Sequence, residues 1–396
     1  MMSFGIPFVG WLACMLPVQG TGAQFVPGAQ GEATSYELFE GTAAVPSYTG
    51  AVELGLNASL IGCLAGQPSP WSGRYAPDGN HVYVTLFGGG LGGSNCLVAK
   101  LDAQTLAPVS TIQVGLAPEE IAFTTTTQGA LEYGFVTNST GSSVSVFNAA
   151  DQVVATIPIP VQPGDPFGTA FPFGLAVAPD QSRVYVGTLD GSGNIYAINV
   201  ATLALEPTET IAFGADHGFA RLTFAGEILV VPITVYNPGF QGSTGEVAFL
   251  DPKSPGTLSE VVLATSPTAS AFPNPIDVEV LGDQVYVCGF DMGPFVYELF
   301  APTGQLVARI PTGTANRQGK LHALGSDGAG LLVAADLITG EVAFLDATAR
   351  RRIGLFDTNS VSVFHSQLND VVIAPDGARL FLPGLGSSTL AVFEHP

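Results

Sequence analysis

Positive charge is scarce in this chain of 396 residues. Lys and Arg together number 12, whereas Asp and Glu number 33, so the formal net charge is −21 at pH 7. Such a charge repels nucleic-acid phosphates and anionic lipid surfaces, so we expect neither nucleic-acid binding nor membrane-surface binding. Cationic ligands or metal ions suit this charge better, although a plain solvated acidic surface explains the same composition.

Cysteine is also scarce, with four residues and no Cys-x-x-Cys pair. The absence of that pair excludes the common zinc sites and c-type haem attachment. A Gly-x-Ser-x-Gly nucleophile elbow is missing as well. Cys63 and Cys96 can form a disulfide in an oxidising compartment. Cys288 lies in a Val-Tyr-Val-Cys strand, so we expect a buried free thiol there.

The first residues are typical of an export signal. An uncharged apolar run from Phe4 to Val18 precedes Thr21-Gly22-Ala23, which resembles a signal-peptidase site. The run is about 15 residues long, whereas a membrane-spanning helix needs about 20. We predict a signal peptide over residues 1–23 and a lead-in over residues 24–47. The protein is then secreted or periplasmic and has no membrane span after signal removal.

A repeated segment is the strongest signal in the chain. Gly73 to Val84, Gly174 to Val186 and Asp370 to Leu382 each combine an apolar strand, a Pro-Asp turn and a second strand with an aromatic residue. Such self-similarity in an all-β pattern is typical of a closed propeller or a solenoid. The best-defined copy predicts four strands, listed here in order: Leu175–Ala178, Arg183–Thr188, Asn194–Val200 and Thr208–Phe213.

The spacing of these repeats predicts seven blades. The first strand of a blade can be placed seven times, which gives about 50 residues per blade, a common propeller repeat. The last blade has only three strands before the chain ends, so Ala51 to Leu56 is expected to complete it and to remove an exposed edge. We therefore predict an all-β, seven-bladed propeller of four-stranded antiparallel blades over residues 48–396. The alternatives are six or eight blades, if His217 to Ala264 is misread, and a pair of β-sandwiches.

Several of these segments resemble the YVTN-repeat propeller family. Phe135-Val136-Thr137-Asn138, followed by a Gly/Ser turn and a hydrophobic strand, is similar to the motif of that family, and Arg183 to Thr188 is a looser copy. The resemblance implies the propeller fold for nearly the whole chain beyond about residue 48. It implies little about function, because such propellers include binding proteins and lactonase-like enzymes.

The predicted blades place polar side chains at one end of the central channel. Aligning the Pro-Asp turns puts Glu120, Asp277 and Asp370 at the start of the first strand of three blades. His217 and His365 lie on the loops just before such strands. Carboxylate oxygens suit Ca²⁺, and imidazole widens the choice to other divalent cations, so these five residues are the candidate metal ligands. The alternative is that Asp277 and Asp370 accept backbone hydrogen bonds in the turns.

The same residues permit a hydrolase. Seven-bladed lactonases of the phosphogluconolactonase type are similar in placing His, Glu and Arg around one channel mouth. Lactone hydrolysis needs a base for water and a cation for the oxyanion. The candidates for the base are His217 and Glu120, and those for the cation are Arg74 and Arg221. No catalytic motif can be matched position by position.

From the sequence we therefore expect a binding or interaction scaffold, with a lactonase-like hydrolase as the alternative. The expected partner is a protein, a carbohydrate or a small molecule, and the expected state is a monomer. Nothing in the sequence indicates a redox cofactor.

Overall fold

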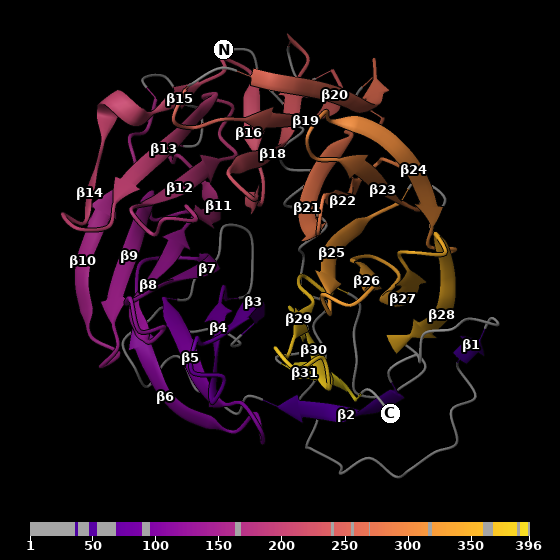
Figure 1. Cartoon of the computed structure of the whole chain (residues 1–396), viewed down its shortest axis with the longest axis horizontal. Helices are drawn as coiled ribbons and strands as arrows, with labels where there is room; N and C mark the ends of the chain where they lie inside the picture. The colour runs from indigo at the N-terminus through magenta and orange to yellow at the C-terminus, as the bar shows by residue number, and fades with distance from the viewer. Residues whose placement is uncertain are drawn as a thin grey trace, which may run out of the picture.

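The computed structural model describes most of the chain. The described residues are 36–38, 47–53, 69–88, 96–162, 168–238, 241–254, 257–268, 270–315, 319–358, 367–385 and 389–394. They form seven antiparallel sheets arranged in a ring, with the first strand of each sheet innermost (Figure 1). The predicted seven-bladed all-β propeller is thus confirmed.

The first three blades follow one another along the chain. Blade 1 contains β3 (Pro70–Tyr75), β4 (His81–Leu86), β5 (Leu97–Asp102) and β6 (Pro108–Gln113). Blade 2 contains β7 (Pro118–Thr125), β8 (Leu131–Asn138), β9 (Ser143–Asn148) and β10 (Val153–Pro158). Blade 3 contains β11 (Pro172–Val177), β12 (Arg183–Thr188), β13 (Asn194–Asn199), β14 (Ala204–Leu205) and β15 (Ile211–Ala212).

Blade 4 has a broken inner strand and long outer ones. It contains β16 (His217–Phe219), β17 (Thr223–Ala225), β18 (Ile228–Tyr236), β19 (Ser243–Leu250) and β20 (Thr257–Ser266). Blade 5 contains β21 (Asn274–Leu281), β22 (Gln284–Phe290), β23 (Phe295–Phe300) and β24 (Gln305–Pro311). The fourth repeat therefore forms a complete blade, so the six-bladed alternative is wrong.

The last two blades each receive a strand from the start of the chain. Blade 6 contains β25 (Leu321–Ser326), β26 (Leu331–Asp336), β27 (Glu341–Asp346) and β28 (Arg351–Asp357), and β1 (Tyr36–Leu38) pairs with β28. Blade 7 contains β29 (Val372–Ile373), β30 (Arg379–Gly384) and β31 (Thr389–Glu394). Its fourth strand is β2 (Ser47–Glu53), antiparallel to β31. The predicted N-terminal closure is confirmed, although the strand lies a few residues earlier than Ala51 to Leu56.

The outer strand of blade 3 differs from its predicted form. Instead of one strand over Thr208–Phe213, the chain pairs with β13 twice, through β14 and β15. A 3₁₀ turn over Pro207–Glu209 separates the two pieces. Proline has no N–H to donate to a ladder, so the pairing is interrupted at that point.

Aromatic packing between neighbouring blades builds the core. For example, Phe147 of blade 2 stacks on Tyr83 of blade 1, with ring centroids 5.3 Å apart. Gly134 lies under the Phe147 ring, where a Cβ atom would come within 2.2 Å of it. Blade 2 thus buries one face against blade 1 and the other against blade 3.

The structure bears on two predictions about the cysteines. Cys288 is a free, buried thiol, as predicted, and burial raises its pKa well above the ordinary value. Cys96 is disulfide-bonded, while its predicted partner Cys63 lies outside the described residues. Within the described ranges, no helix has the length and apolar character to span a membrane.

Candidate functional site

A β-bulge in the inner strand positions the polar side chains of the ring centre. In blade 2, Glu119 and Glu120 of β7 together lie opposite a single residue of β8, Thr137. Blade 1 has the same irregularity, with Trp71 and Ser72 opposite Thr85. An extra residue in one strand bends the ladder and redirects side chains. The bulge therefore lets two successive residues of an inner strand approach the channel.

The threonine opposite each of these two bulges links its blade to the next. Thr137 Oγ1 accepts a hydrogen bond from Glu120 N (3.0 Å) and donates one to the carbonyl oxygen of Phe173 in blade 3 (2.9 Å). Thr85 Oγ1 likewise accepts from Ser72 N (3.0 Å) and donates to Glu119 O in blade 2 (2.6 Å). The Val-Thr pair of the repeat is thus a connector between blades, and it holds the glutamate-bearing bulge in place.

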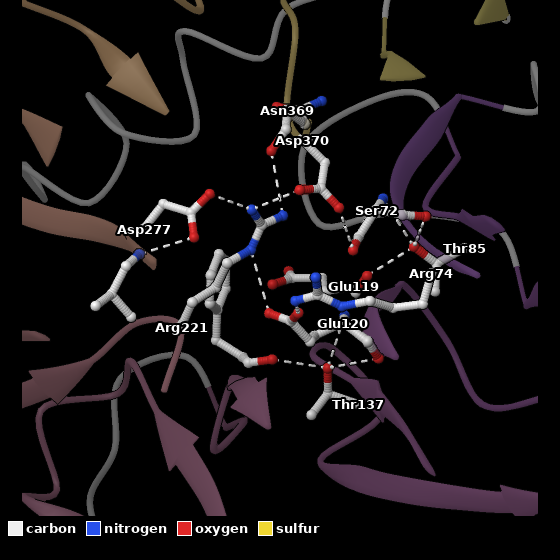
Figure 2. A network of polar contacts seen from close by, with 12 residues as sticks. Ser72, Arg74, Thr85, Glu119, Glu120, Thr137, Arg221, Asp277, Asn369 and Asp370 are labelled. Atoms are coloured by element: carbon white, nitrogen blue, oxygen red, sulfur yellow. Dashed lines mark hydrogen bonds and ion pairs between the residues drawn. The ribbon is translucent and has the colours of Figure 1, made fainter. Parts of the chain in front are cut away.

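Arg221 lies at the centre of the polar cluster (Figure 2). Its Nη1 is 2.6 Å from Asp277 Oδ2 and 2.9 Å from Asp370 Oδ1, and its Nε is 3.2 Å from Glu120 Oε2. Nη2 donates to the carbonyl oxygen of Asn369 (3.2 Å). One guanidinium from blade 4 therefore contacts blades 2, 5 and 7. The side chain is only 4% exposed, so these contacts are shielded from solvent.

Both aspartates are also held by backbone N–H groups. Asp277 Oδ1 accepts from Val278 N, and its Oδ2 accepts from Leu324 N of blade 6. Asp370 accepts from Val371 N, from Gly73 N of blade 1 and from the Ser72 hydroxyl. Asp277 and Asp370 therefore do accept backbone hydrogen bonds, as the alternative to metal binding predicted. Some of the donors belong to the next blade.

Glycine at one position allows the Arg221 segment to come close to blade 3. A Cβ atom on Gly174 would lie 2.1 Å from Ala220 O and 2.8 Å from Arg221 Cα. Any larger side chain at this position would push the Arg221 segment away.

A second guanidinium lies near the first but is open to solvent. Arg74 Nη2 is 3.0 Å from Glu120 Oε1; the Arg74 side chain is 44% exposed, whereas that of Glu120 is 3% exposed. Glu279 of β21 is partly exposed and interacts electrostatically with Arg74. Arg74 and Glu279 occupy equivalent positions in blades 1 and 5, because each pairs with the tyrosine of its second strand, Tyr83 or Tyr286.

Several groups in the cluster have shifted pKa values. Burial raises the pKa of Glu119 to about 8, against the opposing effects of Ser139 and Arg221. Removal from bulk water raises the pKa of Glu279 to about 8, and the neighbouring Asp277 adds to the shift. Burial also raises the pKa of Glu120 and Asp277, although Arg221 opposes the shift for both residues. Burial opposes the charge of Arg221, but Asp277, Asp370 and Glu120 outweigh it and raise its pKa.

Apolar side chains pack together at the N-terminal end of the inner strands. Trp71, Phe173, Ala220 and Ile276, each one residue before the charged level, pack in one buried cluster with residues that follow the second strands. His322 joins them, with its ring centroid 5.6 Å from that of Trp71, and its Nδ1 donates a hydrogen bond to Asn369 O (3.0 Å). Burial and the charge of Arg221 lower the pKa of His322 to about 3, so it is neutral at pH 7.

The structure brings together three of the five predicted metal ligands, Glu120, Asp277 and Asp370, and places Arg221 among them. His217 has other neighbours: its Nδ1 is 2.9 Å from Ala215 O, and its ring packs against Phe213. His365 lies outside the described residues.

Within the described ranges, no group of three or more His, Cys, Asp or Glu side chains has an arrangement that holds a metal ion. Among the catalytic candidates, Arg74 and Glu120 are in contact with each other.

Glu279 is the site residue that sequence reasoning missed. It lies two positions after Asp277 on the same strand. Side chains two apart in a strand share a face, so this spacing already indicates that Glu279 follows Asp277 along the channel.

Comparisons with known proteins support the propeller fold and identify no family. No protein family model matches the sequence, and no curated protein matches it either, so the resemblance to YVTN repeats stays a prediction. Among solved structures, the chain is similar to hydrazine synthase of Kuenenia stuttgartiensis, with a TM-score of 0.65 and 18% identity. The alignment covers 83% of this chain and 96% of that chain. At this level of identity, the likeness supports the propeller fold alone.

Proposed function

We propose that this protein is an exported, acidic β-propeller that acts as a binding scaffold in a secreted or periplasmic location. One observation carries the proposal. The guanidinium of Arg221 bonds to three other blades at once, so the best candidates for chemistry are held as a rigid structural unit. A rigid ring that presents its surface to a ligand fits this arrangement better than a mobile catalytic centre.

A divalent cation such as Ca²⁺ is the first ligand to test. The meeting of Glu120, Asp277 and Asp370 supports it, while the presence of Arg221 among them means that a metal ion would share these carboxylates with a guanidinium. Elemental analysis of the mature protein, with thermal melts in Ca²⁺ and in EDTA, tests this part. A stoichiometric metal and an EDTA-sensitive melting temperature support it. Metal-free protein with identical melts contradicts it.

A lactonase-like hydrolase is the second candidate. The observation in its favour is the contact between the exposed Arg74 and the buried Glu120, whose pKa burial raises. A carboxyl group beside a guanidinium can supply a base and an oxyanion partner. Assaying a lactone panel with wild type, Glu120→Gln and His217→Ala tests this idea. Lack of turnover by the wild type contradicts it for those substrates.

Export is tested separately. Mass spectrometry of the protein recovered from its natural source should give a mature chain that begins at Gln24. A chain that retains residues 1–23 would contradict the signal-peptide prediction.

A further inference from the structure

The outer strand of blade 4 is the longest strand in the described part of the chain. It is β20 (Thr257–Ser266), with ten residues, and it lies at the outer rim of the ring (Figure 1). It pairs with β19 on one side, and among the described residues no strand pairs with its other side. Two bulges, at Leu258 and Leu263, bound a regular stretch over residues 259–262. The outward N–H and C=O groups of such a stretch are available to a further strand.

The outer strands of other blades have features that oppose such pairing. Proline, lysine or arginine on an edge strand disfavours the addition of another strand. The strands β6, β10 and β24 contain such residues, which are Pro108, Pro158, Arg309 and Pro311. Blade 6 has its outer strand β28 covered by β1, and the two outer pieces of blade 3 have two residues each. The sequence of β20, TLSEVVLATS, contains no proline, lysine or arginine; β2 of blade 7 also lacks them but has only seven residues. Thus β20 is the longest outer strand without this protection.

Two large apolar side chains of β20 lie in solvent. Leu258 is 57% exposed, and Val262 is 56% exposed. Glu260 lies between them in the sequence and is exposed as well, on the same face of the strand as Val262. One exposed apolar side chain is ordinary, but two of them on an unpaired edge give a partner strand apolar area to bury.

A pair of carboxyl groups lies beside these apolar side chains. Glu246 of β19 is opposite Val262, and Glu260 is opposite Ala248, so the two glutamates are diagonal neighbours on one face of the sheet. Their side chains are in hydrogen-bond contact, and burial together with Glu260 raises the pKa of Glu246 to about 7. None of the ion pairs in the described ranges includes either residue. A basic group from another molecule would supply their counter-charge.

These features together favour an extended segment of another protein as the occupant of the edge. In strand addition, main-chain hydrogen bonds hold the added segment and its alternate side chains give specificity. Apolar side chains of the segment would cover Leu258 and Val262, while a Lys or Arg between them would reach Glu246 and Glu260. A second copy of this chain fits less well, because β20 contains no basic residue and would bring its own Glu260 to an acidic edge.

We propose that the free edge of β20 binds an extended basic segment of a partner protein by strand addition, with Glu246 and Glu260 holding its Lys or Arg. This inference rests on the proposed scaffold function and specifies the surface and the chemistry of the partner. The net charge of −21 adds long-range attraction for a basic segment.

Calorimetric titration of the purified protein with the peptide acetyl-Thr-Val-Thr-Lys-Thr-Val-Thr-amide tests the proposal. The buffer has a pH of 8, at which Glu246 is mainly ionised, and about 0.15 M NaCl to screen exposed charges. We expect saturable binding with a Kd of about 1 mM or lower. The peptide with Glu in place of Lys should bind at least about tenfold more weakly, because it brings a third carboxylate to the edge.

Variants of the protein test the surface. Val262→Lys places a basic side chain on the edge beside Glu246 and should abolish binding of the lysine peptide. Val109→Lys on β6 is the matched control, since Val109 is 57% exposed, and it should change the affinity less than about twofold. Combining Glu246→Gln with Glu260→Gln should weaken binding about tenfold or more. Glu132→Gln on β8 should change it less than about twofold.

Amide hydrogen exchange locates the peptide on the unmodified chain, in case a variant fails to fold. A saturating concentration of the lysine peptide should slow exchange within β20, because the added strand accepts hydrogen bonds from its outward N–H groups. Exchange within β6 should stay unchanged.

The inference is overturned if the lysine peptide shows no saturable binding, if the lysine and glutamate peptides bind equally, or if β20 gains no protection. Binding that survives Val262→Lys would overturn it as well, but would support a scaffold that uses another surface. A dimer in sedimentation that Val262→Lys dissociates would assign the edge to a second copy of the chain instead.

Discussion

Arg221 Nη1 donates a hydrogen bond of 2.9 Å to Asp370 Oδ1, across 149 residues of chain. The same nitrogen lies 2.6 Å from Asp277 Oδ2, so blades 4, 5 and 7 share one buried guanidinium. Removal of one partner from a buried ionic cluster leaves the other partners charged and unpaired, which costs far more than the loss of an exposed pair.

Arg221→Met should therefore lower the free energy of unfolding by about 3–5 kcal/mol, because Asp277, Asp370 and Glu120 lose their shared counter-charge. Chemical denaturation followed by intrinsic fluorescence measures the loss. Lys253→Met is the control, since Lys253 and its partner Glu227 are both about two-thirds exposed. We expect a change within about 1 kcal/mol there. Equal losses in the two variants would show that the central cluster is not a stabilising unit.

The pKa of Glu119 predicts a dependence of stability on pH. Its folded value of about 8 lies above the ordinary value of 4.5, so the folded state binds more protons than the unfolded state between these two values. The contribution of Glu119 is fully present below about pH 4.5 and is lost as the pH rises through about 8. The free energy of unfolding should fall over this range, with a slope of at most about 1.4 kcal/mol per pH unit from this proton.

Denaturation midpoints from pH 5 to pH 8.5 test this prediction. Glu119→Gln cannot lose a proton, so its stability should fall less steeply with pH than that of the wild type. Glu132→Gln, a change at a partly exposed position on β8, should keep the wild-type slope. Parallel curves for Glu119→Gln and wild type would mean that Glu119 is ionised in the folded state at neutral pH.

Thr137→Val should destabilise the protein by about 1–3 kcal/mol, although valine has nearly the shape of threonine. The hydroxyl group accepts from Glu120 N and donates to Phe173 O, and its loss removes both hydrogen bonds from a buried position between two blades. Thermal unfolding measures the change. Thr265→Val, at an exposed position of β20, should have an effect within about 0.5 kcal/mol. A neutral Thr137→Val would contradict the connector role of this hydroxyl.

A non-reducing digest tests the predicted disulfide. Since Cys96 is disulfide-bonded, we expect one linked peptide that contains Cys63 and Cys96, and Cys288 in its free form. Reduction should lower the free energy of unfolding by about 2–4 kcal/mol. A thiol reagent should label Cys288 only after unfolding, because the residue is buried. A link between Cys96 and a second chain would show that the predicted pairing is wrong.

The blade count and the level of three carboxylates could be predicted because the Pro-Asp turns mark a fixed point in three repeats, from which the other inner strands can be placed. Aligning these turns placed Glu120, Asp277 and Asp370 at one height in the channel, and the structure has them around one guanidinium. The sequence predicted Arg221 as a candidate cation for hydrolysis, whereas the structure buries it among three carboxylates. That burial depends on residues in three other blades, and no local pattern encodes it.

Other features depend on contacts that only the folded ring provides. Glu279 lies on β21, which ends at Leu281 and is followed by Gly282-Asp283 instead of a Pro-Asp turn, so the repeat gives no marker for its position. The closing strand was placed at Ala51 to Leu56 and lies at Ser47–Glu53. Alternation suits both positions, and the register is set by pairing with β31.

The pairing of β2 with β31 has a consequence for how the chain is made. Ser47–Glu53 leaves the ribosome before the rest of the propeller, and its partner, Thr389–Glu394, follows only after the other blades have been synthesised. Thr49 and Val392, which are joined by a hydrogen bond, are 343 residues apart. The ring can therefore close only after β31 has been synthesised. Until then β2 has no partner strand in blade 7, and an unpaired strand of this kind is open to wrong pairing.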